Sequence, residues 1–340
     1  MFYIYLQKGD FCVNIRLINK FMSLFIILNL FYCEANAETV VSANPKLKFH
    51  ADGTFKIVQF ADIHGGPQKD TKAITLMNNV LNYEKPDLVI LTGDNTDGKC
   101  RTVKDIKKAI NIIAEPMESK NIPWAIAFGN HDDEHGVLTK KEMMKIYTTY
   151  SNNLSRYGDE RISGVGNYNL LIEGSKADAA AFNIYIMDSG KYAPESIGGY
   201  DWIKPDQINW YKSTANALKE KYKRTIPAIM FFHIPLKEFK LAWDNGNAVG
   251  QRNEEENASK INSGLFSALL EIGDVKGVFC GHDHTNDYCA ALSGIRLGYA
   301  RNVGNQTYGK DGLPKAARVF LINENEPENF KTWIRSESDF

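Results

Sequence analysis

The stretch VKGVFCGHDH at residues 275–284 reads as a short apolar strand that ends in a glycine and two histidines. In an extended segment, the side chains at positions i and i+2 point to the same side. His282 and His284 are therefore expected to face one point just beyond the end of the strand. Two histidines at this spacing are only modest evidence of a functional site. The residues at the ends of the other strands are needed to interpret them.

Strands and helices alternate through the first half of the chain. The predicted strands are short apolar runs, and the predicted helices carry apolar residues at helical spacing. In order, these elements are strand 55–61, helix 70–83, strand 87–92, helix 102–119, strand 124–128 and helix 140–150. This order predicts parallel strands joined by right-handed crossovers.

The second half of the chain changes character. Segments 168–172 and 182–187 read as an antiparallel pair joined by a polar turn. The later predicted elements are helix 205–222, strand 226–232, helix 263–272, strand 275–280 and the closing strands 296–300 and 317–323. Residues 236–260 form a long polar segment without a clear period, and a loop of that length is usually functional, such as a lid. Residues 38–340 show no repeat or linker, so we expect a single domain.

The predicted strands end in a distinctive set of side chains. Five of the seven histidines follow strand ends, together with carboxylates and an asparagine. The set is Asp62, His64, Asp94, Asn130, His131, His233, His282 and His284. Any one of these residues alone is more simply a structural, hydrogen-bonded side chain. Because the carboxyl ends of the strands in an α/β sheet are where ligands gather, we expect the whole set to converge.

The residue types in this set indicate a metal site. Carboxylate, imidazole and amide oxygen suit borderline or hard cations such as Mn, Fe, Zn, Co or Ni, and the chain has no CxxC pair for a thiolate zinc site. Without His131 the set still has seven ligands, which is too many for one ion. A bridging carboxylate would allow two ions, and two ions about 3.5–4 Å apart form a clamp for in-line displacement at phosphorus.

The ordered motifs D-x-H, G-D-x-x-D, G-N-H-D, H and G-H-x-H resemble those of the calcineurin-like metallophosphoesterase superfamily. Several further segments resemble the purple-acid-phosphatase-like branch of this superfamily. They are residues 84–89, 166–170, 199–203, 232–236, 262–266 and 281–287. The branch includes plant proteins named probable inactive purple acid phosphatases and related fungal phosphatases. The resemblance spans residues 55–323. It implies a four-layer α/β/β/α sandwich with two mixed β-sheets and the metals at their shared rim.

The resemblance also implies a role for each motif residue. One ion would be held by Asp62, His64, Asp94 and His284, and the other by Asp94, Asn130, His233 and His282, with Asp94 bridging. His131 would assist the leaving group as a general acid or hydrogen-bond donor, and Asp132 would orient it. True purple acid phosphatases have a tyrosine three residues after the bridging aspartate. Here that residue is Asp97, so a ferric-tyrosinate chromophore is not expected and a ferric/divalent pair is in doubt.

The implied activity is hydrolysis of a small-molecule phosphate ester or a phosphoprotein by in-line attack of a metal-bridging hydroxide. A nucleotidase or cyclic-nucleotide phosphodiesterase of the same fold is an alternative. A catalytically silent binding scaffold is the alternative from a different class. Arg252 in the long polar segment, with Asn130 and His131, is a candidate for binding the substrate phosphate, although a solvated loop residue is the simpler interpretation of Arg252.

Residues 1–37 have the features of a signal peptide. An apolar run at residues 22–33 follows basic residues and precedes a small-x-small cleavage pattern that ends at Ala37. The run is too short for a transmembrane helix. We therefore expect cleavage after Ala37, export to the periplasm or the medium, and no transmembrane anchor in the mature chain. A true start at Met22 is an alternative, and so is a lipoprotein anchored at Cys33, although the bulky residue before Cys33 disfavours the latter.

The composition is that of a soluble globular protein. Hydrophobic residues make up 44% of the 340 positions, charged residues 24%, and the formal net charge is −1. A general nucleic-acid binder usually carries a basic patch, so stable nucleic-acid binding is not expected.

Cys280 and Cys289 could pair on neighbouring strands, but buried thiols are the simpler interpretation.

Overall fold

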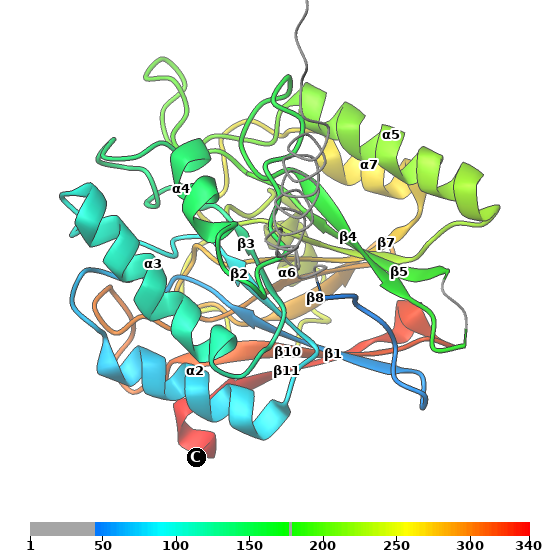
Figure 1. The fold of residues 1–340 in the computed structure, drawn as a ribbon. Helices are drawn as coiled ribbons and strands as arrows, with labels where there is room; N and C mark the ends of the chain where they lie inside the picture. The colour runs from blue at the N-terminus through cyan, green and yellow to red at the C-terminus, as the bar shows by residue number, and fades with distance from the viewer. Residues whose placement is uncertain (1–44, 177–178) are drawn as a thin grey trace, which may run out of the picture. The chain divides into compact units, whose positions relative to one another are not determined.

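Two β-sheets packed face to face form the centre of the protein, and helices cover their outer faces (Figure 1). The structure is a computed structural model that describes residues 45–176 and 179–340. All described residues belong to one compact unit. The expected signal peptide, residues 1–37, lies outside the described residues.

The first sheet has five strands in the order β11-β10-β1-β2-β3. Its strands are β1 (Thr54–Phe60), β2 (Leu88–Thr92), β3 (Trp124–Ala127), β10 (Ala316–Asn323) and β11 (Lys331–Ser336). β1, β2 and β3 run parallel, whereas β10 is antiparallel to β1, and β11 is antiparallel to β10. Helices α2 (Thr71–Glu84) and α3 (Val103–Glu118) connect the parallel strands, as the alternation of elements predicts.

The second sheet has six strands in the order β4-β5-β6-β7-β9-β8. They are β4 (Tyr168–Glu173), β5 (Ala180–Ile186), β6 (Ala228–Phe231), β7 (Val275–Cys280), β8 (Cys289–Leu292) and β9 (Ile295–Tyr299). β5, β6, β7 and β9 run parallel, and the edge strands β4 and β8 are antiparallel to their neighbours. The predicted antiparallel pair is therefore confirmed as β4 and β5.

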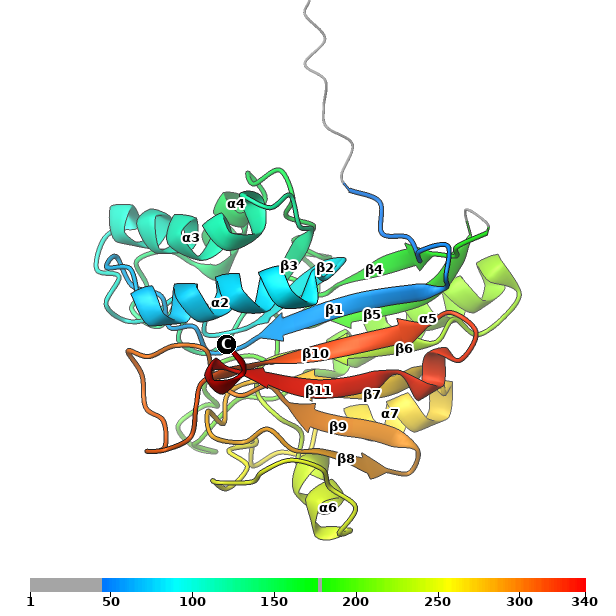
Figure 2. The same ribbon diagram turned by 90° about the horizontal axis from the view of Figure 1, so that it is seen from below.

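The helices form the two outer layers (Figure 2). Helices α2, α3 and α4 (Lys140–Tyr147) pack on the first sheet. Helices α5 (Pro205–Tyr222), α6 (Glu238–Asp244) and α7 (Leu265–Ile272) pack on the second sheet. Short 3₁₀ turns at Pro327–Asn329 and Glu337–Asp339 flank β11. The expected four-layer α/β/β/α sandwich with two mixed sheets is confirmed.

The space between the sheets is filled by apolar and aromatic side chains. The ring of Phe279 on β7 lies 4.6 Å from that of Phe320 on β10 and 6.2 Å from that of Phe231 on β6. The central strands are buried on both faces because a second sheet covers one face and helices cover the other. Every residue of β2, β5 and β6 is accordingly buried.

Polar side chains fix where the first helices begin. The carboxylate of Asp70 accepts a hydrogen bond from the backbone of Ala73 at 3.1 Å, and Thr102 and Thr139 form capping boxes at the starts of α3 and α4. The predicted starts are therefore correct to within one residue.

Among the residues that the structure describes, no helix combines the length and the hydrophobicity needed to cross a bilayer.

The polar segment at residues 236–260 is more ordered than its sequence pattern indicates. It contains α6, which is too short to show a helical period. Beyond α6, the segment is bound to the residues that follow β7. The backbone N–H of Gln251 donates to the carboxylate of Asp287 at 2.6 Å, and the backbone N–H of Asp287 donates to the carbonyl of Gln251 at 2.9 Å. The segment expected as a lid is thus fastened to the second sheet.

Two edge strands, β8 and β11, are absent from the predicted elements. β8 has only four residues, and β11 is partly exposed along its whole length, so neither stands out as a strand in sequence. β9 lies between the strands that carry Cys280 and Cys289, and both cysteines are free. The alternative of a disulfide between neighbouring strands is therefore wrong. Cys280 is a buried thiol, and Cys289 is half-buried.

Replacing Phe279 by alanine tests the packing between the sheets. The side chain is fully buried, so the Phe279→Ala variant should lose about 3–5 kcal/mol of unfolding free energy, measured by urea denaturation. Leu270→Ala is the control, because Leu270 is 45% exposed and its loss should change stability by about 0.5 kcal/mol or less. Equal effects of the two substitutions would contradict the described core.

Candidate metal centre

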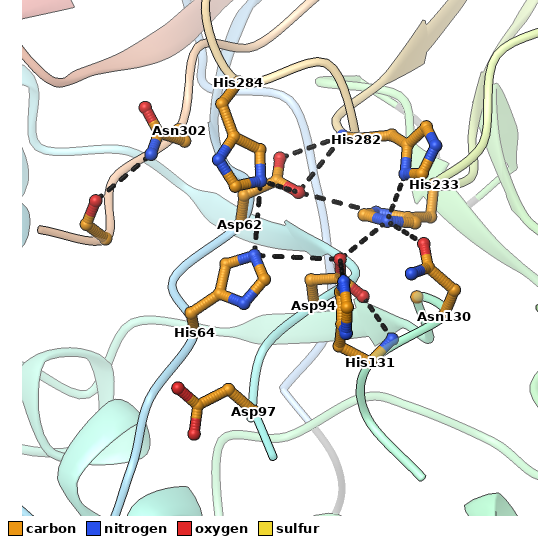
Figure 3. Close-up of polar contacts among 12 residues, drawn as sticks. Asp62, His64, Asp94, Asp97, Asn130, His131, His233, His282, His284 and Asn302 are labelled. Atoms are coloured by element: carbon orange, nitrogen blue, oxygen red, sulfur yellow. Dashed lines mark hydrogen bonds and ion pairs between the residues drawn. The ribbon is translucent and has the colours of Figure 1, made fainter. Parts of the chain in front are cut away.

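The carboxyl ends of β1, β2, β3, β6 and β7 meet at one rim of the sandwich, and the residues that follow them converge there (Figure 3). All seven ligand candidates from the sequence are buried. They are Asp62, His64, Asp94, Asn130, His233, His282 and His284. His131 lies beside them at the surface of the cluster.

Asp62, His64 and His284 form the first group of side chains that could hold an ion, with ligand atoms within 4.8 Å of one another. Nε2 of His64 and Nε2 of His284 are 3.2 Å apart. Nε2 of His284 is also 3.5 Å from Oδ1 of Asp62. This group brings together the ends of β1 and β7, which belong to different sheets.

Asp94, His233 and His282 form the second group, within the same distance limit. Nε2 of His233 lies 3.1 Å from Oδ2 of Asp94 and 3.2 Å from Nδ1 of His282. The side-chain oxygen of Asn130 lies 3.1 Å from the same nitrogen of His233. The four residues expected around the second ion are therefore close together.

The carboxylate of Asp94 lies between the two groups. Its Oδ2 atom is 3.1 Å from Nε2 of His233 and 3.7 Å from Nε2 of His64. Its Oδ1 atom accepts a hydrogen bond from the backbone N–H of His131 at 2.8 Å, which holds the carboxylate in this orientation. A carboxylate in this position can contribute to both groups, as a bridging ligand must.

Several ligand candidates have a left-handed backbone conformation. Their φ angles are 53° at Asp62, 48° at His64, 47° at Asp94 and 76° at His282. Such angles are uncommon outside glycine and cost roughly 1–3 kcal/mol each. Backbone hydrogen bonds between neighbouring strand ends hold this conformation, including one of 2.8 Å from the N–H of His64 to the carbonyl of Asp94. Strain of this kind is concentrated at functional sites.

The glycines that precede the ligand candidates leave no room for a side chain. A Cβ on Gly129 would lie 2.2 Å from Oδ1 of Asp94. A Cβ on Gly281 would lie 2.5 Å from Oδ2 of Asp62. The glycine in the G-N-H and G-H motifs is thus explained, because it lets the backbone of one strand end approach the carboxylate of another.

In two of the histidines, a hydrogen bond to a backbone carbonyl determines which ring nitrogen faces the cluster. Nδ1 of His233 lies 2.9 Å from the carbonyl of Thr92, and Nδ1 of His284 lies 3.0 Å from the carbonyl of Tyr308. A neutral imidazole that donates from Nδ1 keeps a lone pair on Nε2, and in both residues Nε2 faces the cluster. Metal-ligating histidines usually have such a partner on the second nitrogen.

The cluster holds more acceptor atoms than donors. Nε2 of His233 faces two oxygens and a nitrogen, and Nε2 of His64 faces Nε2 of His284. Buried lone pairs that face one another are unfavourable unless a proton or a cation lies between them. The donor set therefore fits a pair of cations.

Electrostatics in the ion-free chain agree with this geometry. Burial lowers the pKa of His64 to about 4, and burial together with His233 lowers the pKa of His282 to about 3. Burial also opposes charge on His233, but the carboxylate of Asp94 outweighs it and raises the pKa of His233 to about 9. The cluster thus favours positive charge beside the carboxylate of Asp94.

The partner of His131 differs from the sequence-based expectation. Nε2 of His131 is 4.0 Å from Oδ2 of Asp94, and Nδ1 is 2.6 Å from the carboxylate of Glu134. Asp132 instead accepts a hydrogen bond from the backbone N–H of Gly129 at 2.8 Å, and burial and Asp94 raise the pKa of Asp132 to about 6. Glu134 therefore makes the contact with His131 that was expected of Asp132. Asp132 holds the backbone of the loop that carries His131, through Gly129.

Arg252 has partners of its own. Its guanidinium lies 2.8 Å from the carboxylate of Glu256 and 2.8 Å from that of Glu255. These contacts engage Nε and Nη2 of the guanidinium, so they favour a structural role for Arg252. Asp97, which stands where a tyrosine would follow the bridging aspartate, pairs with Lys99 at 2.9 Å. Figure 3 shows its carboxylate pointing away from the cluster.

Aromatic residues cover the outer side of the cluster. The ring of Tyr308 stacks on that of His284, with centroids 3.9 Å apart, and the ring of Tyr200 meets that of His282 edge-on at 4.3 Å. Nδ2 of Asn302 donates to the same Tyr308 carbonyl that faces His284, at 3.2 Å. These contacts come from loops without a helical or strand period. Tyr200 lies in the segment 199–203 that carries part of the resemblance, but the sequence assigned no role to it.

Comparison with known proteins agrees with the motifs. The calcineurin-like phosphoesterase family profile matches residues 55–286. A protein named "Probable inactive purple acid phosphatase 29" from Arabidopsis thaliana is 38% identical over 332 residues, covering 85% of this chain and 84% of that protein. "Phosphatase DCR2" from Saccharomyces cerevisiae is 33% identical over 320 residues, covering 84% of this chain and 54% of that protein.

Solved structures share the fold at low sequence identity. A dimetal phosphatase from Danio rerio is 13% identical, with a TM-score of 0.55 and coverage of 83% of this chain and 98% of that one. A purple acid phosphatase from yellow lupin seeds is 12% identical, with a TM-score of 0.50 and coverage of 85% of this chain and 55% of that one. These similarities concern the fold, which is that of the metallophosphoesterases.

Substitution of the shared carboxylate should reduce metal binding at both groups. After incubation with Mn or Zn and desalting, elemental analysis should find about two ions per wild-type chain. In Asp94→Asn, we expect less than about half of that content, because one of the shared oxygens becomes a weakly coordinating amide. Asp97→Asn is the matched control and should keep both ions, since its carboxylate points away from the cluster. Equal metal content in all three proteins would refute the bridging role of Asp94.

Proposed function

The chain belongs to the calcineurin-like phosphoesterase family, in the branch that contains the purple-acid-phosphatase-like relatives, and we propose that it hydrolyses phosphate esters with the help of two metal ions. The observation that carries this proposal is the shared carboxylate of Asp94. It lies between two buried ligand groups, and His131 stands at their edge.

The ligand groups suggest how the ions would be held. Asp62, His64 and His284 would bind one ion, Asn130, His233 and His282 the other, and Asp94 both. The mixture of carboxylate, imidazole and amide oxygen suits Mn, Fe, Zn, Co or Ni. When bound, such a pair supplies an activated hydroxide and offsets the charge on the phosphoryl oxygens.

His131 is placed to act on the leaving group. Its side chain is 35% exposed, whereas the ligand candidates are buried, so a substrate that enters from solvent meets this ring beside the cluster. Its Nε2 atom faces the cluster, and its Nδ1 atom is held by Glu134. We assign Nε2 of His131 the role of giving a proton or a hydrogen bond to the leaving oxygen.

The residues present favour catalysis over a silent scaffold. The names of the plant relatives include the word "inactive". In this chain, however, every ligand position is filled, and the histidine for the leaving group is in place. A scaffold that no longer bound ions would not need several strained, buried ligand residues directed at two neighbouring points.

Hydrolysis of model substrates tests the proposal. The metal-stripped protein is reloaded with Mn, Zn, Fe or Co and assayed with a chromogenic phosphomonoester, a chromogenic diester, a nucleoside monophosphate and a cyclic nucleotide. Turnover of the simple esters that depends on added metal supports the proposal. Preference for one of the nucleotides would indicate the nucleotidase or phosphodiesterase alternative. Absence of turnover with every metal would favour the scaffold.

The His131→Ala variant separates metal binding from catalysis. It should keep both ions and lose turnover by roughly 10²-fold or more, the usual contribution of a positioned acid. Elemental analysis and steady-state kinetics on the same sample provide both measurements. A fully active His131→Ala protein would remove His131 from the mechanism.

We also propose that the protein is exported after removal of residues 1–37, on the strength of the apolar run and the small-x-small pattern at its end. Expression of the full chain in a secreting host, followed by mass spectrometry of the N-terminal peptide, should find Glu38 as the first residue. Retention of the leader on protein inside the cell would contradict this proposal, and a lipid on Cys33 would favour the lipoprotein alternative.

A further inference from the structure

The ring of His131 is held by a turn of its own loop. The backbone N–H of Glu134 donates to the carbonyl of His131 at 3.3 Å, and this turn folds the Glu134 side chain back over the ring. The carboxylate Oε2 atom of Glu134 then lies 2.6 Å from Nδ1 of His131. The loop follows β3 directly and lies outside every helix and strand, so regular secondary structure does not hold the ring.

A second segment clamps this turn from outside. The hydroxyl of Tyr192 lies 2.7 Å from the other carboxylate oxygen of Glu134. The preceding residue, Lys191, lies 3.0 Å from the carboxylate of Asp133. Lys191 and Tyr192 belong to the connection between β5 and α5, which is part of the second sheet's side of the molecule. Two consecutive residues of that connection thus fasten two consecutive residues of the His131 loop.

The hydroxyl of Tyr192 also reaches a ligand candidate. Nδ2 of Asn130 donates to this hydroxyl at 3.4 Å. Because the amide nitrogen is turned toward Tyr192, the amide oxygen of Asn130 is turned toward Nε2 of His233, 3.1 Å away. An amide ligates a cation through its oxygen, so this orientation is the one that the second ligand group needs.

These contacts determine which nitrogen of His131 is available. A carboxylate accepts only, so a neutral His131 ring keeps its proton on Nδ1 and its lone pair on Nε2, and a protonated ring donates from both. In either case, Nε2 is the atom that faces the cluster, 4.0 Å from Asp94. Without Glu134, the partly exposed ring could turn or change tautomer, since the described residues place no other hydrogen-bond partner on it.

We propose that Glu134 and Tyr192 are positioning residues for the reaction. Glu134 fixes the orientation and tautomer of His131, and Tyr192 fixes both Glu134 and the amide of Asn130. The pair therefore couples the group that acts on the leaving oxygen to one of the ligands of the second ion. This inference rests on the proposed phosphoesterase activity and adds to it two residues that lie outside the family's motifs.

The dependence of the rate on the leaving group tests the proposal. Substituted phenyl phosphates are assayed with the metal-loaded wild type and with Glu134→Ala, Tyr192→Phe and Asp133→Ala. A weakly acidic phenol needs a proton as it leaves, and an acidic one does not. Glu134→Ala should therefore lose roughly 10²-fold in kcat with the least acidic phenol and about threefold or less with the most acidic one. Tyr192→Phe should lose rate in the same direction by a smaller factor.

Asp133→Ala is the matched control. It removes a carboxylate and an ion pair from the same loop but has no contact with the ring of His131. Its rates should therefore run parallel to those of the wild type over the whole series. Elemental analysis of each variant shows whether the ions are retained. If Glu134→Ala shows the same leaving-group dependence as the wild type or as Asp133→Ala, Glu134 only supports the loop, and the proposal is overturned.

A spectroscopic measurement keeps the inference testable apart from activity. Long-range ¹⁵N–¹H spectra of the imidazoles report which nitrogen carries the proton, and the His131 signals are assigned as those missing from His131→Ala. In wild type, Nδ1 of His131 should carry a proton both in the neutral ring and in the charged ring that also donates from Nε2, and Glu134→Ala should show a mixture of tautomers in the neutral ring. Identical His131 signals in the two proteins would overturn the proposal. A wild type without turnover but with the predicted signals would defeat the proposed activity and leave the positioning role intact.

Discussion

Lone pairs crowded together in a buried site are the constraint on which this structure depends. Imidazole nitrogens and carboxylate oxygens from different strands approach one another to 3.1–3.7 Å where water is largely excluded. The carboxylate of Asp94 raises the pKa of His233, so the cluster favours positive charge at this point. A pair of cations would offset the repulsion between the acceptors, because each cation can contact several acceptors at once. The cluster therefore has the properties of a binding site for cations, whose positive charge the side chains alone do not provide.

The rest of the rim keeps these acceptors in place. The two sheets bring their strand ends to the same edge, and a core of aromatic side chains between the sheets holds the strands in register. Glycines let the backbone of one strand end approach the carboxylate of another. Residues with left-handed backbone angles carry several of the ligand side chains. Backbone carbonyls accept from Nδ1 of His233 and His284, which leaves Nε2 of each ring facing the cluster. The glycines and the left-handed residues are unfavourable for stability alone. Together they are explained by the need to direct the ligand atoms at two neighbouring points.

Periodic patterns predicted the order of the strands and helices, and the resemblance to the metallophosphoesterases implied the four-layer sandwich and the ligand sets at its rim. Parallel strands with crossover helices must place their carboxyl ends at one edge of a sheet, so residues such as Asp62 and Asp94 could be assigned to one site from the pattern alone. Contacts between loops follow no period. Glu134, Tyr192 and Tyr308 act through turns and connections whose course depends on tertiary structure. The edge strands β8 and β11 were missed because β8 has only four residues and β11 is polar and partly exposed along its length.

Direct location of the ions tests the central claim. Crystals of the protein loaded with Mn or Zn, measured on both sides of the absorption edge of that metal, give the ion positions from anomalous differences. We expect two peaks about 3.5–4 Å apart, with the carboxylate of Asp94 between them. Peaks only at the surface, or no peak within reach of Asp62, Asp94 and His233, would contradict the claim that these side chains converge to hold a pair of cations.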